Sequence, residues 1–179
     1  MTEAAAIYGQ ALYDLARDEG LSQKILGELT ALDQSLRAEP AFVQLLSAPN
    51  IPKEERVRIL DQSFRGKLHP YVLNFLKILT EKGYIKHFSA CCQAYRQHYN
   101  QDNGIMPVTA YTAVPMSEAQ RRKLTAKLSA VTGKTIELRC RIDPEALGGV
   151  RLDFDGKQVD GTVRRRLEDI RGILKNTVL

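Results

Sequence analysis

The sequence has few cysteines and no long apolar run. A membrane-spanning helix needs an apolar run of roughly 18 residues, and no run in the 179 residues approaches that length. The most apolar segment, residues 68–79, is interrupted by Asn74 and Lys77. The three cysteines include the adjacent pair Cys91 and Cys92, and the odd count is typical of reduced thiols. The first residues show neither a signal peptide nor a transit peptide pattern. We therefore expect a bacterial cytoplasmic protein without a disulfide or a membrane span.

Motifs for catalysis and nucleotide binding are also missing. There is no GK[ST] and no GxGxxG, and Gly148-Gly149 precedes a strand pattern instead of a helix. The segment Asp153–Gly156 departs from a calcium loop in the place of its glycine and lacks the distal glutamate. No serine, cysteine or lysine has a recognisable partner set for nucleophilic catalysis. The sequence predicts neither an enzyme nor a cofactor site.

One helical face carries potential metal ligands. His87, Cys91 and His98 are spaced i, i+4 and i+11, whereas Cys92 falls on the stripe that we expect to be buried. A structural zinc site needs a closed tetrahedral set, and a fourth ligand is absent. We expect no metal at this place.

The apolar pattern of residues 1–104 is helical throughout. Helical periods cover residues 4–19, 21–38, 52–64, 68–82 and 85–99, with a short apolar turn at 42–46. Gly20 and Glu39-Pro40 are typical helix ends, and Pro52 suits a first helical position. Because the connections are short, the pattern predicts a compact bundle of five long helices and one short one.

Two of these helices have wider apolar faces than one core contact needs. Taking ~100° per residue, the apolar residues of segment 4–19 cover roughly 180° and those of segment 68–82 roughly 220°. A helix buried at the centre of a bundle explains such a face. A helix with one side on the core and another side available to a partner helix explains it equally.

The pattern changes after Gly104. Residues 105–113, 136–142 and 150–154 have strand character, and the Asp155-Gly156 turn leads into a further short strand. A capping box at Ser117–Gln120 starts a helix that Gly133 ends. A last helix carries one apolar stripe, consisting of Val163, Leu167, Ile170 and Leu174. We predict a mainly α protein: a six-helix bundle over 1–104, then a small α+β domain over 105–179 with about three strands and two helices.

All of the excess positive charge lies in the second part. Residues 1–104 hold 12 basic and 12 acidic side chains, whereas residues 105–179 hold 14 and 9, which accounts for the net charge of +5. Arg164, Arg165, Arg166 and Arg171 gather on the last helix. A solvated or acid-paired helix face explains them, and so does a surface for an acidic partner.

The carboxyl-terminal pattern resembles a known family. The order Asp143-Pro144, a leucine, Gly148-Gly149, an alternating strand, Asp160-Gly161-Thr162 and an arginine-rich helix is similar to the signature of F-type ATP synthase delta subunits, which include the oligomycin sensitivity conferral protein. Tyr8, Ala11, Leu12 and the Glu81–Gly83 turn extend the resemblance over the whole chain. This chain has Thr162 where the family usually has serine, and Gly9 where alanine is common.

The resemblance implies a subunit of the peripheral stalk of the proton-translocating F-type ATP synthase. Such a subunit tethers the catalytic head to the membrane-anchored b subunits and resists the rotary torque on the head. It implies that the helical bundle grips the N-terminal helix of an alpha subunit between the first and fifth helices, at Tyr8, Ala11, Leu12, Leu15, Phe75, Ile78 and Leu79. It implies that the second domain binds the C-terminal ends of the b subunits, with Ile170, Ile173, Leu174 and nearby arginines as candidates. The protein would lie peripherally at the cytoplasmic face of the bacterial inner membrane, associated with it only through the complex.

Two other function classes stay open at this point. A small RNA-binding protein could use the arginines of the last helix, since a basic stripe holds phosphate backbones. An enzyme of unknown type is the third possibility.

Overall fold

The structure is a computed structural model that describes residues 3–146, 148–154 and 156–161. The chain divides into two compact units, Met1–Asn100 and Gln101–Leu179. Over the described residues the fold is mainly helical with one small four-stranded sheet, which confirms the predicted class. No helix in these ranges is long and apolar enough to cross a membrane.

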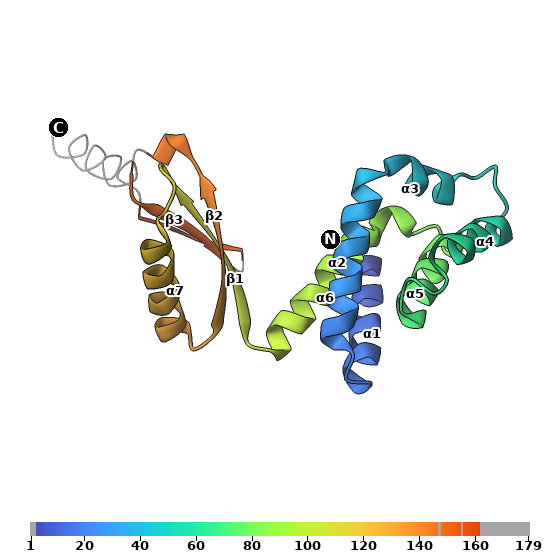
Figure 1. Cartoon of the computed structure of the whole chain (residues 1–179), viewed down its shortest axis with the longest axis horizontal. Coiled ribbons are helices and arrows are strands. Elements are labelled where there is room, and N and C mark those ends of the chain that lie inside the picture. Colours follow the sequence, from blue (N-terminus) through green and yellow to red (C-terminus); the bar gives the residue numbers. More distant parts are fainter. Residues whose placement is uncertain (1–2, 147, 155, 162–179) are drawn as a thin grey trace, which may run out of the picture. The chain divides into compact units, whose positions relative to one another are not determined.

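The first unit consists of helices joined by short turns (Figure 1). Its elements are α1 (Glu3–Asp18), α2 (Ser22–Ala38), α3 (Pro40–Ser47), α4 (Lys53–Phe64), α5 (Pro70–Glu81), the 3-10 helix η1 (Ile85–His87) and α6 (Phe88–Asp102). Pro52, expected at the first position of the helix over 52–64, is instead the N-cap residue of α4, with ψ 145°. The helical segments of the sequence pattern therefore appear with boundaries shifted by a few residues.

Glycines end two of these helices, and the sequence predicts this for Gly20. Gly20 has φ 69°, and beyond it the Leu21 backbone N–H donates to the Ala16 carbonyl at 2.7 Å. Gly83 has φ 76°, and the Tyr84 N–H donates to Leu79 at 2.7 Å. Both are left-handed caps in which the N–H after the glycine satisfies an otherwise orphaned carbonyl.

A single hydrophobic cluster unites the helices of this unit, and α1 meets α6 in it at very short range. A Cβ placed on Gly9 would lie 2.5 Å from the Cys91 carbonyl oxygen and 2.6 Å from Ala94 Cβ. The Tyr13 ring packs edge-on against Tyr95, with ring centroids 5.3 Å apart. Glycine at this position is what allows the two helix backbones to approach so closely.

The buried face of α6 contains the predicted stripe and one further residue. On the stripe predicted for residues 85–99, Ile85, Phe88 and Tyr95 are at most 2% exposed. Cys92, which was assigned to the same stripe, is only partly buried and packs against the core cluster, whereas Cys91 beside it is 1% exposed. The stripe is therefore confirmed, except that Cys91 and not Cys92 is the more deeply buried cysteine.

Polar contacts join α2 to α6 beside this core. The Tyr95 hydroxyl donates to the Ser22 carbonyl at 2.9 Å, and Arg96 Nη2 donates to Thr30 Oγ1 at 2.7 Å. The Ser89 hydroxyl also bonds Asp33. Burial raises the pKa of Tyr95, so its hydroxyl keeps its proton and remains a donor.

The second unit has a mixed sheet in the order β2-β1-β3-β4. Its strands are β1 (Ile105–Thr112), β2 (Thr135–Ile142), β3 (Val150–Phe154) and β4 (Lys157–Asp160), with a 3-10 turn η2 (Pro144–Ala146) before β3. β1 pairs in parallel with β2 and antiparallel with β3. β3 also pairs antiparallel with β4. The helix α7 (Glu118–Thr132) connects β1 to β2 and lies against one face of the sheet (Figure 1).

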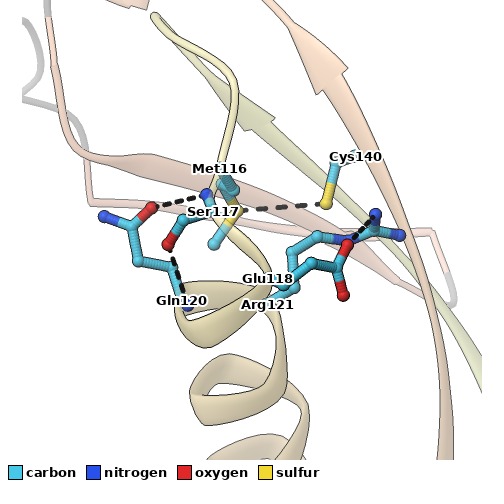
Figure 2. A network of polar contacts seen from close by, with 6 residues as sticks. All are labelled: Met116, Ser117, Glu118, Gln120, Arg121 and Cys140. Carbon is cyan, nitrogen blue, oxygen red and sulfur yellow. Dashed lines mark hydrogen bonds and ion pairs between the residues drawn. The ribbon is translucent and has the colours of Figure 1, made fainter.

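The start of α7 has the predicted capping box. The Gln120 N–H donates to Ser117 Oγ at 3.3 Å, and the Ser117 N–H donates to Gln120 Oε1 at 2.8 Å (Figure 2). The Met116 sulfur lies 3.9 Å from Cys140 Sγ on β2. Figure 2 shows this contact beside the start of α7. Gly133 ends the helix at φ 67°, as predicted.

The described residues form four strands, whereas the predicted count was about three. The fourth is β4, the short strand predicted after the Asp155-Gly156 turn, and all of its residues pair with β3. The predicted last helix, with its apolar stripe and its four arginines, lies outside the described residues.

Candidate partner-binding surface

The helix α1 divides its wide apolar arc between the core and the surface. Leu12 and Ala16 are buried, as are Ala5, Gly9 and Tyr13 on the same side. Ile7 is 60% exposed, Leu15 is 43% exposed, and Ala11 between them is exposed as well. At ~100° per residue these three lie within roughly 80° of one another, so they form one apolar strip along the outer face of α1.

An aromatic pair extends this strip beyond α1. The rings of Tyr8 and Tyr84 are 5.9 Å apart between centroids, which connects α1 to the turn that follows α5. Tyr84 is 38% exposed and Tyr8 is partly buried. We refer to Ile7, Tyr8, Ala11, Leu15 and Tyr84 together as the α1 surface.

Of the seven residues predicted to contact an alpha subunit, three are buried in the core and four reach the surface at least in part. Leu12, Phe75 and Leu79 belong to the core, with at most 6% of their surface exposed, so they support the helices from inside. Tyr8 and Ile78 are partly buried, while Ala11 and Leu15 are exposed.

Ile7 and Tyr84 were not among the predicted contact residues. Ile7 lies one turn before Ala11 and could have been assigned from the helical period. Tyr84 could not, because nothing in the sequence signals its contact with Tyr8, 76 positions earlier.

Ile170, Ile173 and Leu174, predicted to contact the b subunits, lie outside the described residues, as do the nearby arginines.

The side chains once considered as metal ligands have other surroundings. His98 stacks on Tyr13 with ring centroids 5.9 Å apart, and His87 lies beside Tyr84 at 6.2 Å. Burial raises the pKa of the Cys91 thiol to about 11, which disfavours the thiolate that a metal requires. Across the described residues, no group of three or more histidines, cysteines and carboxylates could hold a metal ion.

The α1 surface therefore offers mainly apolar contacts, and none of its five residues is a metal ligand of the kind discussed above. It combines two large aliphatic side chains, a small alanine between them and two tyrosines with hydroxyl groups. Such a composition is typical of a surface that receives the apolar face of a helix.

Comparisons with known proteins agree on one family. The family model of the ATP synthase delta (OSCP) subunit matches residues 4–174. ATP synthase subunit delta of Lactobacillus delbrueckii subsp. bulgaricus is 35% identical over 176 residues, which cover 96% of each chain. ATP synthase subunit delta of Alkaliphilus oremlandii is 34% identical over 160 residues, or 89% of each chain.

A solved structure shares the fold. A chain of the Toxoplasma gondii mitochondrial ATP synthase hexamer, determined by cryo-EM, superposes with a TM-score of 0.74 at 19% identity, covering 97% of this chain and 98% of that one. These relatives give no support to the RNA-binding alternative. The chain belongs to the ATP synthase delta (OSCP) subunit family, whose members are non-catalytic subunits of the peripheral stalk of the F-type ATP synthase.

Proposed function

We propose that the first unit, a six-helix bundle, binds the N-terminal helix of an alpha subunit on the α1 surface and at Ile78 of α5. One observation carries the proposal. Of the four large apolar side chains of the first unit that are most exposed among the described residues, Ile7 and Leu15 lie on α1, and Tyr84 contacts α1 through Tyr8. Exposed apolar side chains that gather in this way mark an interaction surface.

The composition of the α1 surface suits a helical partner. Burial of Ile7 and Leu15 supplies the driving force, at about 25 cal/mol per Å2 of apolar surface removed from water. Ala11 between them permits close approach of a second helix. Tyr8 buries its ring while its hydroxyl can stay in contact with water.

The second unit completes the tether in this proposal. It binds the C-terminal ends of the b subunits through Ile170, Ile173 and Leu174 and the nearby arginines. The protein then lies peripherally at the cytoplasmic face of the inner membrane and resists the torque of the central shaft on the catalytic head. Because the two units hold two partners of one complex, each bound partner raises the effective concentration of the other.

The α1 surface is tested by calorimetric titration of the full chain with a synthetic peptide of the alpha subunit's N-terminal segment from the same organism. We expect binding that is insensitive to salt, since apolar burial drives it. The substitution Ala11→Asp places a carboxylate between Ile7 and Leu15, and we expect it to weaken binding at least tenfold. The matched control is Ala31→Asp, which makes the same change at an exposed position of α2.

Equal peptide affinity in the wild-type and Ala11→Asp chains would refute the assignment of the surface. Far-UV circular dichroism of both variants shows whether the helices persist, and we expect them to, because both alanines are exposed.

A further inference from the structure

The helix α5 begins at an unusual N-cap residue. Serine, threonine, aspartate and asparagine are the residues preferred at this position, whereas the N-cap residue of α5 is His69, with φ −60° and ψ 142°. Its ring nitrogen Nδ1 accepts a hydrogen bond from the Tyr71 backbone N–H at 3.3 Å. Histidine is the side chain whose charge ordinarily changes between pH 5 and 8. A proton can therefore remove this cap, whereas it could not remove a serine or asparagine cap.

The Tyr71 N–H depends on the ring because it belongs to the first turn of the helix, where backbone donors have no partner within the helix. Pro70, the first helical residue, has no N–H, and the His69 carbonyl accepts from the Leu73 N–H at 3.1 Å. The imidazole also packs edge-on against the Tyr71 ring, with ring centroids 5.0 Å apart. The side chain of His69 thus completes the start of α5.

The contact with Tyr71 determines both the charge and the tautomer of His69. A backbone N–H can only donate, so Nδ1 must offer its lone pair, and the neutral ring then carries its proton on Nε2. Protonation of Nδ1 would place two N–H groups opposite each other. It would also put a positive charge at the positive end of the helix dipole. The capped helix start therefore requires the neutral ring.

A carboxylate lies beside the same residue. The His69 backbone N–H donates to Glu28 Oε2 of α2 at 2.7 Å. A negative charge at this distance attracts an imidazolium, so the protonated ring has a second position available to it. His69 is only partly buried, which leaves its ring accessible to protons from water. The other charged side chains of the neighbouring segments are Lys24 of α2, Asp61 of α4 with its partners Arg65 and Lys77, and the exposed Lys67.

We propose that His69 is a pH-sensitive switch at the start of α5. At neutral pH the uncharged ring caps the Tyr71 N–H. In acid the imidazolium gives up that contact and turns towards the Glu28 carboxylate, and the first turn of α5 opens to water. The inference does not depend on the stalk proposal, because Ile78 lies about two turns further along the helix.

The switch is tested by NMR of the full chain between pH 8 and pH 5. At pH 8 we expect the ring nitrogen shifts of His69 to be those of the tautomer protonated on Nε2. As the pH falls, the Tyr71 amide signal should change together with the signals of the His69 ring. The protection of the Tyr71 N–H from hydrogen exchange, corrected for the intrinsic effect of pH, should fall roughly fivefold, as expected for the loss of one N-cap contact.

Three variants assign the effect. His69→Asn keeps a capping oxygen that does not titrate, so the protection of the Tyr71 N–H should stay constant over this range. Glu28→Gln keeps an oxygen acceptor for the His69 N–H but removes the charge, so the transition should move to lower pH. The matched control is His87→Asn, at an exposed histidine beyond the other end of α5, which should respond as the wild-type chain does.

Two results on the wild-type chain would overturn the proposal without any variant. One is a His69 ring that carries its proton on Nδ1 at pH 8, and the other is a Tyr71 amide that stays unchanged between pH 8 and pH 5. An equal response in the wild-type and His69→Asn chains would also overturn it, because another group would then cause the change.

Discussion

At the scale of single residues, Gly9 shows how far a local interpretation can differ from the packed structure. By helix propensity alone, glycine in the middle of α1 costs about 1 kcal/mol relative to alanine. In the structure the Gly9 backbone lies directly against α6, and a Cβ there would meet a carbonyl oxygen and a Cβ at 2.5 and 2.6 Å. The space available to the residue, and not its propensity, therefore decides what fits at position 9.

We predict that Gly9→Ala destabilises the protein. Overpacking costs about 1–3 kcal/mol, which exceeds the propensity gain, so the midpoint of thermal unfolding should fall. Gly27→Ala on α2 is the matched control, because no atom lies within 4 Å of its added Cβ, and it should be neutral or stabilising. A Gly9→Ala chain as stable as the Gly27→Ala chain would show that α1 shifts at little cost.

Single contacts of this kind are what the sequence could not predict. The apolar period of α1 indicated two faces, but the side that meets the core depends on α6, which begins 70 positions after α1 ends. For the same reason Leu12 was predicted as a partner contact and proved to be buried, whereas Ile7 was omitted and is exposed.

At the scale of elements, an ion pair connects the neighbouring helices α4 and α5. Asp61 Oδ1 lies 2.7 Å from Lys77 Nζ, and Arg65 Nη2 is 3.6 Å from the other carboxylate oxygen. The hydrogen bond from Lys77 is the largest cause that lowers the pKa of Asp61, and the charges of Lys77 and Arg65 act in the same direction, while desolvation opposes them. The pair contributes to stability only while Asp61 is ionised.

We predict that Lys77→Met reduces the acid sensitivity of the fold. The pKa of Asp61 is lower in the folded than in the unfolded chain, so its contribution is complete above the unfolded value of about 3.9 and is lost as the pH falls through the folded value. Urea unfolding at neutral pH should show a modest loss of stability in the variant, and the difference from wild type should shrink below about pH 4.

The exposed Lys67 supplies a control, Lys67→Met, for which we expect no such convergence. A constant gap between the wild-type and Lys77→Met stabilities at every pH would mean that lost packing, and not the ion pair, explains the variant.

Elements were easier to predict than their contacts, because the signals that start and stop them are local. Ser117, Gln120 and Gly133 act within one turn of α7, and their roles follow from side-chain chemistry alone. The parallel pairing of β1 with β2 joins residues 30 positions apart and has no comparable local signal. The sequence thus predicted most of the strands and not the order in which they pair.

At the scale of the whole molecule, the two compact units indicate that binding can be divided between them. We predict that a fragment of residues 1–104, which retains all of α6, binds the alpha N-terminal peptide with the affinity of the full chain. The same fragment should not bind the C-terminal segment of a b subunit, whereas the full chain should. Calorimetry with both peptides measures this.

Two outcomes would contradict the division. A fragment that loses affinity for the alpha peptide while keeping its helical circular dichroism spectrum would place part of that site in the second unit. A fragment that binds the b segment would remove the assignment of b binding to residues 105–179.

The contact at Gly9 also bears on how the protein ages chemically. Cys91 lies where α1 presses against α6, its thiol has almost no exposed surface, and its raised pKa leaves little thiolate at neutral pH. Oxidants attack the exposed thiolate most readily. Cys91 thus combines an inert, buried thiol with a backbone that touches Gly9 of α1, and we expect its oxidation to report how often the contact between α1 and α6 opens.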